Sequence, residues 1–233
     1  MQTTEAIILA GGLGTRLKGV ISDIPKPMAP VANQPFLKYL LDYLKKQGIK
    51  KVILSVGYKY EIIQNFFGNN YSDLELIYSI ENTPLGTGGG IRLAINHLTS
   101  DKTFIVNGDT FYDVNLPQME EFFINQKSDL CLALKPLKQF DRYGSVSLEK
   151  NKITQFVEKQ FVKEGLINGG IYLVKTELFE NFNNQQIFSF EKDLMEKQID
   201  KKNISGFISD TYFIDIGIPE DYKQANIDFN KKH

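Results

Sequence analysis

The chain has few of the residues that carry most redox, nucleophilic and zinc chemistry. Its 233 residues include one cysteine, two histidines and no tryptophan. A single cysteine excludes a disulfide within the chain, and Cys131 lies in the apolar run 129–134, where we expect a buried, unreactive thiol. His97 and His233 have no cysteine or histidine neighbour at metal-ligand spacing, so a zinc site is not expected. Carboxylates, lysines, arginines and a bound metal ion therefore have to carry any reaction.

The chain also lacks a charge excess and long apolar runs. It has 27 Lys and Arg against 28 Asp and Glu, a formal net charge of -1, whereas nucleic-acid-binding domains usually show a basic excess. No apolar run approaches the roughly 20 residues of a membrane-spanning helix, and the N-terminus lacks the basic-then-apolar pattern of a signal segment. We therefore expect no nucleic-acid partner, no membrane contact and a cytoplasmic location. The oligomeric state stays open, with a homodimer as one candidate.

Hydrophobic patterning predicts one α/β domain over residues 1–233. Up to about residue 135, strand and helix patterns alternate, which is typical of a Rossmann-like open sheet, mixed and mainly parallel, with helices on both faces. The expected strands there are 6–10, 51–56, 74–80, 103–107 and 129–135, and the expected helices are 35–47, 60–67, 91–98 and 116–125.

After Pro136 the predicted strands become shorter. They are 145–148, 153–158, 170–174, 204–208 and 212–216, with helices at 176–182, at 190–199 and from residue 219 onward. We expect these residues, about 136–233, to add antiparallel strands that extend or cap the sheet. No low-complexity linker or repeat separates them from the first part.

The first strand runs into a glycine-rich turn that predicts a phosphate site. Gly11, Gly12 and Gly14 allow a tight turn whose amides can hold phosphate oxygens. Arg16, beside Thr15, and Lys26, held between two prolines, supply positive charge. The turn is neither a P-loop nor a dinucleotide fingerprint, because Leu17 breaks both patterns. The alternative is a tight turn without a ligand.

Two aspartates predict a magnesium site. Asp109 follows a buried strand, at the edge where ligands bind in open α/β sheets, and Asp215 lies within an apolar strand, where a carboxylate needs a partner. If the two carboxylates meet, they suit a hard cation such as Mg²⁺. The alternatives are a turn cap for Asp109 and a buried salt bridge for Asp215.

Two further turns carry weaker signals. Residues 81–90 form a second glycine-rich turn before the helix expected at 91–98. Glu158 and Lys159 end one short strand, and Asn168 and Gly169 open the next. A lysine and an amide beside bare glycine backbone could hold the phosphate and hydroxyls of a sugar. An ordinary hairpin is the alternative.

Taken in order, these motifs resemble the nucleotide-sugar pyrophosphorylase family, the sugar-1-phosphate nucleotidyltransferases. The resemblance covers nearly the whole chain. It rests on residues 9–16 (LAGGLGTR), 25–28 (PKPM), 84–88 (PLGTG), 108–109 (GD), 143–144 (YG), 158–159 (EK), 168–170 (NGG) and 215–217 (DIG). Within the family, residues 27–31, 35–41, 54–58 and 84–89 are most similar to the D-glycero-α-D-manno-heptose 1-phosphate guanylyltransferases. These stretches are mostly scaffold, and the residues alone derive neither guanine nor heptose.

The resemblance implies a GT-A-like fold and a reaction. A sugar 1-phosphate would attack a nucleoside triphosphate, such as GTP, and release pyrophosphate. Residues about 1–135 would bind the nucleotide and residues about 136–233 the sugar phosphate. The implied catalytic residues are Arg16, Lys26 and Asp109, with Mg²⁺ on Asp109 and Asp215. The implied nucleotide-binding residues are Leu9, Ala10, Gly11, Gly12, Gly14, Thr15, Glu81, Pro84, Gly86, Thr87 and Gly88. The implied sugar-phosphate-binding residues are Gly144, Glu158, Lys159, Asn168 and Gly169.

Three other hypotheses differ in function. One is a uridylyl-, thymidylyl- or cytidylyltransferase that acts on another sugar 1-phosphate. Another is a non-catalytic nucleotide-sugar sensor, which would not need to keep both Asp109 and Asp215. A nicotinamide-dependent oxidoreductase is disfavoured because Leu17 stands where the dinucleotide fingerprint needs glycine.

Overall fold

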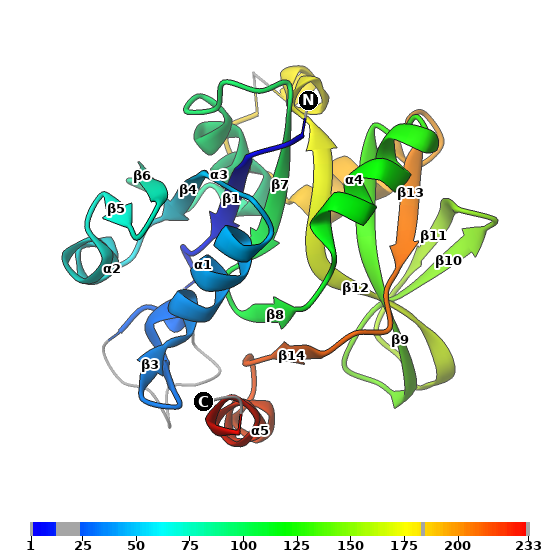
Figure 1. The fold of residues 1–233 in the computed structure, drawn as a ribbon. Coiled ribbons are helices and arrows are strands. Elements are labelled where there is room, and N and C mark those ends of the chain that lie inside the picture. The colour runs from blue at the N-terminus through cyan, green and yellow to red at the C-terminus, as the bar shows by residue number, and fades with distance from the viewer. Residues whose placement is uncertain (1, 13–23, 183–184, 232–233) are drawn as a thin grey trace.

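The structure is a computed structural model that describes residues 2–12, 24–182 and 185–231. Its main feature is one large mixed sheet (Figure 1). In spatial order the strands are β10 (Ser145–Glu149), β11 (Lys152–Val157), β13 (Ile204–Ile208), β9 (Leu130–Phe140), β12 (Val162–Lys175), β7 (Lys102–Asn107), β1 (Glu5–Leu9), β4 (Lys51–Val56), β6 (Leu74–Ile80) and β5 (Asn70–Tyr71). Two small pairs accompany it: β14 (Phe213–Asp215) with β8 (Thr110–Tyr112), and β2 (Pro30–Val31) with β3 (Gln34–Pro35).

Helices cover both faces of this sheet, which confirms the predicted α/β fold. The α-helices are α1 (Phe36–Lys46), α2 (Tyr60–Phe67), α3 (Gly86–Ile95), α4 (Leu116–Asn125) and α5 (Pro219–Asn230). A 3-10 turn, η2 (Lys26–Met28), a 3-10 helix, η3 (Thr176–Phe182), and a π-helix, η4 (Phe190–Glu196), complete the set. None of the helices in the described part of the chain is long and apolar enough to cross a membrane.

The core consists of two hydrophobic clusters, one on each face of the sheet. Helices α1, α4 and α5 bury their apolar residues in one cluster, and α3, η3 and η4 bury theirs in the other. Figure 1 shows α1 and α4 in front of the sheet, with α3 behind. In α1 the buried residues recur every three to four positions, as a helix with one apolar face requires.

The central strands β6, β4, β1 and β7 are parallel. Strand β1 pairs with β4 on one side and β7 on the other, and β4 pairs in parallel with β6. Their carboxyl ends therefore meet at one edge of the sheet, where ligands bind in open α/β folds. Strand β12 then pairs antiparallel with β7 and β9, so the second half of the chain continues the same sheet.

Two strands are longer than the sequence predicts. Strand β9 continues past Pro136 to Phe140, although a proline lacks the N–H that a strand interior needs. Pairing of β9 with β13 ends at Leu134, so the position of Pro136 is bonded to a strand on one side only. Strand β12 runs through Gly169 and Gly170, where a register shift and a φ of +77° at Gly170 bend it without ending it.

Helix α3 begins five residues before the predicted start at residue 91. Its first turns contain Gly86, Gly88 and Gly89. Residues 186–188 lie so close to these turns that they leave no room for side chains at the glycine positions. A Cβ on Gly88 would lie 2.3 Å from the ring of Phe188, and one on Gly89 would lie 2.6 Å from the carbonyl oxygen of Gln186. These glycines are therefore part of a packed helix, and not of the free turn that the sequence predicts.

We expect Glu5 to make stability depend on pH. This residue, only 4% exposed, accepts hydrogen bonds from the backbone N–H groups of Thr99 and Ser100 and lies 3.0 Å from the ammonium of Lys51. Burial raises the pKa of Glu5, but these partners outweigh burial and lower the pKa from 4.5 to about 2. The lowered pKa adds about 3 kcal/mol to the free energy of unfolding. This contribution is complete above pH 4.5, where the carboxyl is ionised in both states, and it is lost as the pH falls toward 2.

Urea unfolding of the wild type and of Glu5→Gln at a series of pH values measures this contribution. The difference in unfolding free energy between the two proteins should shrink as the pH is lowered through this window. A difference that does not change with pH would contradict the assignment. Glu180→Gln, at an exposed position, is the control.

Candidate active site

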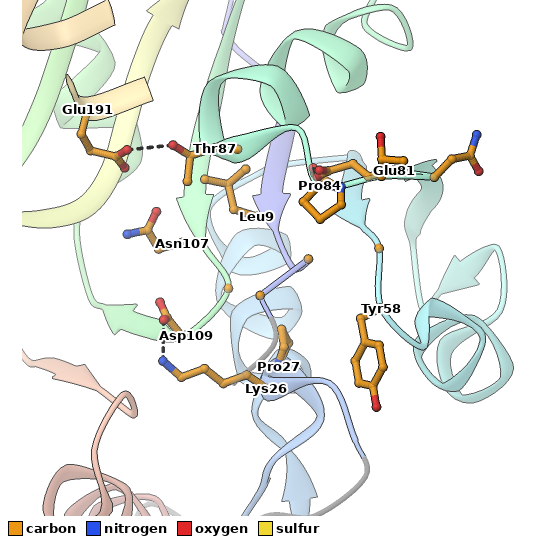
Figure 2. Close-up of a pocket in the computed structure, with 18 residues that line it drawn as sticks. Leu9, Lys26, Pro27, Tyr58, Glu81, Pro84, Thr87, Asn107, Asp109 and Glu191 are labelled. Atoms are coloured by element: carbon orange, nitrogen blue, oxygen red, sulfur yellow. Dashed lines mark hydrogen bonds and ion pairs between the residues drawn. The ribbon is translucent and has the colours of Figure 1, made fainter. Parts of the chain in front are cut away.

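A cavity of about 800 Å³ opens at the carboxyl ends of the parallel strands. Each of β1, β4, β6 and β7 contributes residues from its end or from the loop that follows. The lining residues are Leu9, Gly11, Gly12, Lys26, Pro27, Ser55, Gly57, Tyr58, Glu81, Asn82, Thr83, Pro84, Gly86, Thr87, Asn107, Gly108, Asp109 and Glu191. Figure 2 shows the labelled side chains converging from these different elements. Polar groups at one sheet edge, around an open volume of this size, are typical of a small-molecule site.

Lys26 and Asp109 form an ion pair in this cavity. The Lys26 Nζ lies 2.6 Å from Asp109 Oδ2, and the two side chains are 14% and 37% exposed (Figure 2). Pro25 and Pro27 fix the backbone dihedrals around Lys26, and η2 begins at the lysine itself. The local sequence thus places a cation at the carboxyl end of β7.

Asp215 reaches the same place from the C-terminal part of the chain. Strand β14 pairs Asp215 with Thr110 of β8, and the backbone N–H of Ile216 donates to the carbonyl oxygen of Asp109 at 2.9 Å. Burial and the nearby charge of Asp109 raise the pKa of Asp215, against the lowering effects of Lys26 and of the Gly217 N–H. Among the described residues, two carboxylates and one lysine therefore meet at this point.

Glu81 sets the shape of the loop on the other side of the cavity. Its Oε2 accepts a hydrogen bond from the Leu85 N–H at 3.0 Å, and its Oε1 accepts one from the Ser55 hydroxyl at 3.2 Å. The Glu81 N–H donates to the carbonyl oxygen of Val56 at 2.8 Å. The carboxylate thus closes the loop that leads from β6 into α3 and ties it to β4.

A second cavity, of about 340 Å³, lies in the C-terminal part. It is lined by Arg142, Tyr143, Gly144, Ser145, Val146, Phe156, Val157, Glu158, Lys159, Asn168, Glu191, Lys192, Met195, Glu196, Asp215, Gly217, Ile218 and Asp221. Arg142 lies 3.0 Å from Asp221 of α5, and its guanidinium lies 5.6 Å from the ring centre of Tyr143. Asp215 belongs to this cavity and Asp109 to the first, so the carboxylate pair stands between the two.

Most of the predicted site residues line one of these cavities. Leu9, Gly11, Gly12, Lys26, Glu81, Pro84, Gly86, Thr87 and Asp109 line the first, and Gly144, Glu158, Lys159, Asn168 and Asp215 line the second. Gly14, Thr15 and Arg16 lie outside the described residues.

The structure places the other three predicted residues behind the cavity walls. The Ala10 N–H donates to the carbonyl oxygen of Ser55 at 2.8 Å, within the sheet edge. Gly88 faces the ring of Phe188, and a Cβ on Gly169 would lie 2.3 Å from the ring of Tyr112. These residues shape the backbone around the site, and the structure does not bring them into its lining.

Sequence reasoning missed several lining residues that carry polar or charged groups, among them Tyr58, Asn107, Arg142 and Glu191. Two of them, Asn107 and Tyr58, lie at or just after the carboxyl ends of β7 and β4. Because ligands bind at this edge of an open α/β sheet, the positions of these two residues in the sequence are a signal that could identify them. Arg142 precedes a quoted Tyr-Gly pair. Glu191 lies in a segment that reads as an ordinary helix, and nothing in the local sequence marks it.

The carboxylate pair fits a divalent cation such as the one the family resemblance implies. In the described part of the chain, no group of three or more His, Cys, Asp or Glu side chains is placed to hold a metal. The protein would therefore supply two carboxylates, and phosphate oxygens and water would complete the shell. Mg²⁺ is usually bound in this way, and the charge of Asp109, which raises the pKa of Asp215, favours a cation between the two carboxylates.

Comparisons with known proteins identify the family. A model of the nucleotidyl transferase family matches residues 5–232. A D-glycero-α-D-manno-heptose 1-phosphate guanylyltransferase of Aneurinibacillus thermoaerophilus is 52% identical over 221 residues, which are 95% of this chain and 96% of that one. The enzyme of the same name from Campylobacter jejuni is 50% identical over 94% of this chain and 96% of its own. The crystal structure of HddC from Yersinia pseudotuberculosis complexed with GMP-PN superposes with a TM-score of 0.86 at 38% identity, covering 97% of this chain and all of that one. The chain belongs to the nucleotidyl transferase family.

Proposed function

We propose that the protein transfers GMP from GTP to D-glycero-α-D-manno-heptose 1-phosphate and releases pyrophosphate. The observation that carries this proposal is the junction of Lys26, Asp109 and Asp215 between two cavities. The identity of the substrates is supported by relatives that are 50–52% identical over nearly their whole length. The product would be a nucleotide-activated heptose for surface polysaccharide synthesis. Because GTP is a cytoplasmic metabolite, the reaction would run in the cytoplasm.

In this proposal the larger cavity holds GTP. The glycine turn of Gly11, Gly12 and Gly14, with Thr15, would hold the triphosphate, with Leu9 and Ala10 at the end of β1 beside it. The loop of Glu81 and Pro84, with Gly86 and Thr87 in the first turn of α3, would hold the nucleoside, and Gly88 would shape the backbone next to them. This assigns residues about 1–135 to the nucleotide.

The smaller cavity would hold the sugar phosphate. Lys159 would pair with the phosphate, and Glu158 and the Asn168 amide would bind sugar hydroxyls. Gly144 would let the backbone come close to the sugar phosphate, and Gly169, which lies against the ring of Tyr112, would shape the strand next to Asn168. This assigns residues about 136–233 to the sugar 1-phosphate.

The reaction is an in-line displacement. A phosphate oxygen of the sugar 1-phosphate bonds to the α-phosphorus of GTP while the bond to the β-phosphate oxygen breaks, and pyrophosphate leaves. No protein nucleophile takes part, which suits a chain whose one cysteine is fully buried. Catalysis of this kind rests on positioning and charge stabilisation.

The charged residues divide this work. Lys26 would neutralise charge at the reacting phosphates, and Arg16 would stabilise the leaving pyrophosphate. Asp109 and Asp215 would hold Mg²⁺, which when bound supplies further neutralisation of the phosphate charge. Asp109 has a second task, since its ion pair holds the Lys26 ammonium in place.

Pyrophosphate release from a substrate panel tests the proposal. GTP, UTP, dTTP and CTP are each combined with heptose 1-phosphate, mannose 1-phosphate and glucose 1-phosphate, in the presence of Mg²⁺. We expect turnover with GTP and heptose 1-phosphate to exceed every other pair, and EDTA to abolish it. A clear preference for UTP, dTTP or CTP would overturn the guanylyl assignment. Tight binding of the nucleotide-sugar without any turnover would favour a sensor.

A further inference from the structure

Glu191 connects the two cavities of the candidate active site. Among the described lining residues it is the one that both cavities share. It lies in the first turn of η4, partly buried, and none of the functions proposed above uses it. Figure 2 shows its side chain directed at Thr87, which lies in the first turn of α3 on the proposed nucleotide side.

One oxygen of this carboxylate is fixed by the protein. Glu191 Oε2 accepts hydrogen bonds from the Thr87 hydroxyl at 2.8 Å and from the Ser189 hydroxyl at 3.0 Å. The Thr87 hydroxyl oxygen in turn accepts from the Phe190 N–H at 2.9 Å. Because several contacts hold it, the side chain does not lose much further freedom on binding a ligand, which is how preorganised sites gain affinity.

The backbone around this contact is also held from both sides. The Gly88 N–H donates to the carbonyl oxygen of Phe188 at 3.0 Å, and the Phe188 N–H donates to that of Leu85 at 3.1 Å. The Phe188 ring, 3% exposed, lies against Gly88. The nucleotide-side loop and the start of η4 therefore form one unit with a fixed distance between them.

The other oxygen is available to a ligand. Within the described residues, no hydrogen bond reaches Glu191 Oε1. The carboxylate is close enough to the sugar-side residues that its negative charge adds to burial in raising the pKa of Tyr172. The hydroxyl of Tyr172 accepts a hydrogen bond from the Asn168 amide at 2.9 Å, and Asn168, a predicted sugar-binding residue, lines the smaller cavity together with Glu191.

The chemistry of a carboxylate decides what it can bind here. A carboxylate accepts hydrogen bonds and repels phosphate, so its partners are hydroxyl or N–H groups and not the phosphates of either substrate. Four residues of η4, namely Glu191, Lys192, Met195 and Glu196, line the smaller cavity, whereas Glu191 alone among them lines the larger one. The geometry therefore favours the sugar 1-phosphate over GTP as the substrate that Glu191 contacts.

We propose that Glu191 is a specificity-determining residue that accepts hydrogen bonds from sugar hydroxyl groups through Oε1, while Oε2 anchors it to the first turn of α3 on the nucleotide side. The inference rests on the proposed function, because it assumes a hydroxyl-rich sugar 1-phosphate in the smaller cavity. A direct consequence is that Thr87, on the nucleotide side, influences use of the sugar phosphate through Glu191.

Steady-state kinetics of Glu191→Gln and Glu191→Ala test the proposal. Each substrate is varied at saturation of the other. We expect the KM for the sugar 1-phosphate to rise about 10- to 100-fold, as for loss of a hydrogen bond to a charged group, while the KM for GTP stays within error. Thr87→Val, which removes only the anchoring hydroxyl, should raise the same KM about threefold to tenfold. Glu180→Gln, at an exposed position outside both cavities, is the matched control.

Monodeoxy analogues of the accepted sugar 1-phosphate separate recognition from a merely structural role. The wild type should lose efficiency when the hydroxyl that Glu191 binds is missing, and Glu191→Ala should no longer distinguish that analogue from the parent sugar. If Glu191→Ala instead loses discrimination between GTP and dGTP, the residue binds the ribose and the proposal is wrong. Unchanged kinetics in both Glu191 variants would also overturn it.

The outcome is distinguishable from failure of the proposed function. The wild type is assayed first with the full substrate panel. If the wild type prefers another nucleotide or sugar 1-phosphate, the same variants are measured with those two substrates. A rise in the KM for the sugar 1-phosphate without a rise in the KM for the nucleotide still tests Glu191.

Discussion

Asp109→Asn is expected to lower kcat about 10²- to 10³-fold, by analogy with the loss of other groups that stabilise transition-state charge. The substitution keeps the size of the side chain and removes the charge that faces Lys26 at 2.6 Å. It also removes one of the two carboxylates proposed to hold Mg²⁺. The Mg²⁺ concentration needed for half-maximal turnover should therefore rise together with the fall in kcat. Pyrophosphate release at a series of Mg²⁺ concentrations measures both quantities.

Asp42→Asn is the matched control for this experiment. Asp42 also pairs with a lysine, Lys38, at 2.7 Å, and its side chain is 45% exposed against 37% for Asp109. It lies on α1, and neither cavity includes it. The control should keep wild-type turnover. Near-normal kcat in Asp109→Asn would remove Asp109 from the catalytic residues.

Lys26→Met should lower kcat to a similar extent, about 10²- to 10³-fold. Its effect on the Mg²⁺ concentration needed for half-maximal turnover should be opposite to that of Asp109→Asn. The substitution keeps an unbranched apolar stem and removes the one described cation beside Asp109 and Asp215. Without it, the charge at the reacting phosphates is less well neutralised. The two carboxylates, however, become more attractive to a cation, so less Mg²⁺ should be needed for half-maximal turnover. The same Mg²⁺ titration distinguishes this variant from Asp109→Asn.

Lys38→Met removes the lysine of the comparison pair and should leave kcat unchanged. Thermal unfolding of all four variants establishes that they are folded. If Lys26→Met turns over at the wild-type rate, Lys26 serves only as a partner of Asp109. A requirement for more Mg²⁺ in this variant would show that Lys26 helps to hold the metal site together.

Local patterns predict the parallel half of the fold well. Strands β4 and β7 and helices α2 and α4 lie where buried runs and 3.6-residue periodicity place them. Glycine and proline predict the ends of strands and helices less reliably in this chain, because their effect depends on neighbours distant in the sequence. Pro136 is tolerated in β9 since β13 no longer pairs there, and Gly88 fits within a helix since Phe188 lies against it. Neither partner can be recognised from the local sequence.

The same distinction holds for the candidate site, where local sequence predicts some residues and others depend on neighbours distant in the chain. Asp109 could be predicted because it follows a buried strand, and strand ends of this kind meet at one edge. Its proximity to Asp215 depends on the pairing of β8 with β14. The sequence predicts a strand at 212–216, which contains β14, but it predicts neither the three-residue strand β8 nor the pairing of the two. Glu191 depends on the packing of residues 185–191 against the start of α3, which no periodicity shows.

The pairing of β12 with β7 has a consequence for the order in which the chain can fold. During synthesis β7 is complete at residue 107, but the strand that covers its outer side, β12, spans residues 162–175. If β1, β4, β6 and β7 pair before β12 has been made, their sheet ends at β7 in an edge without a partner strand, which includes the apolar residues Phe104–Val106. Edges of this kind can pair with other chains. The second part of the chain, from about residue 136, thus completes the sheet that the first part begins, and the two parts are not expected to persist as separate units.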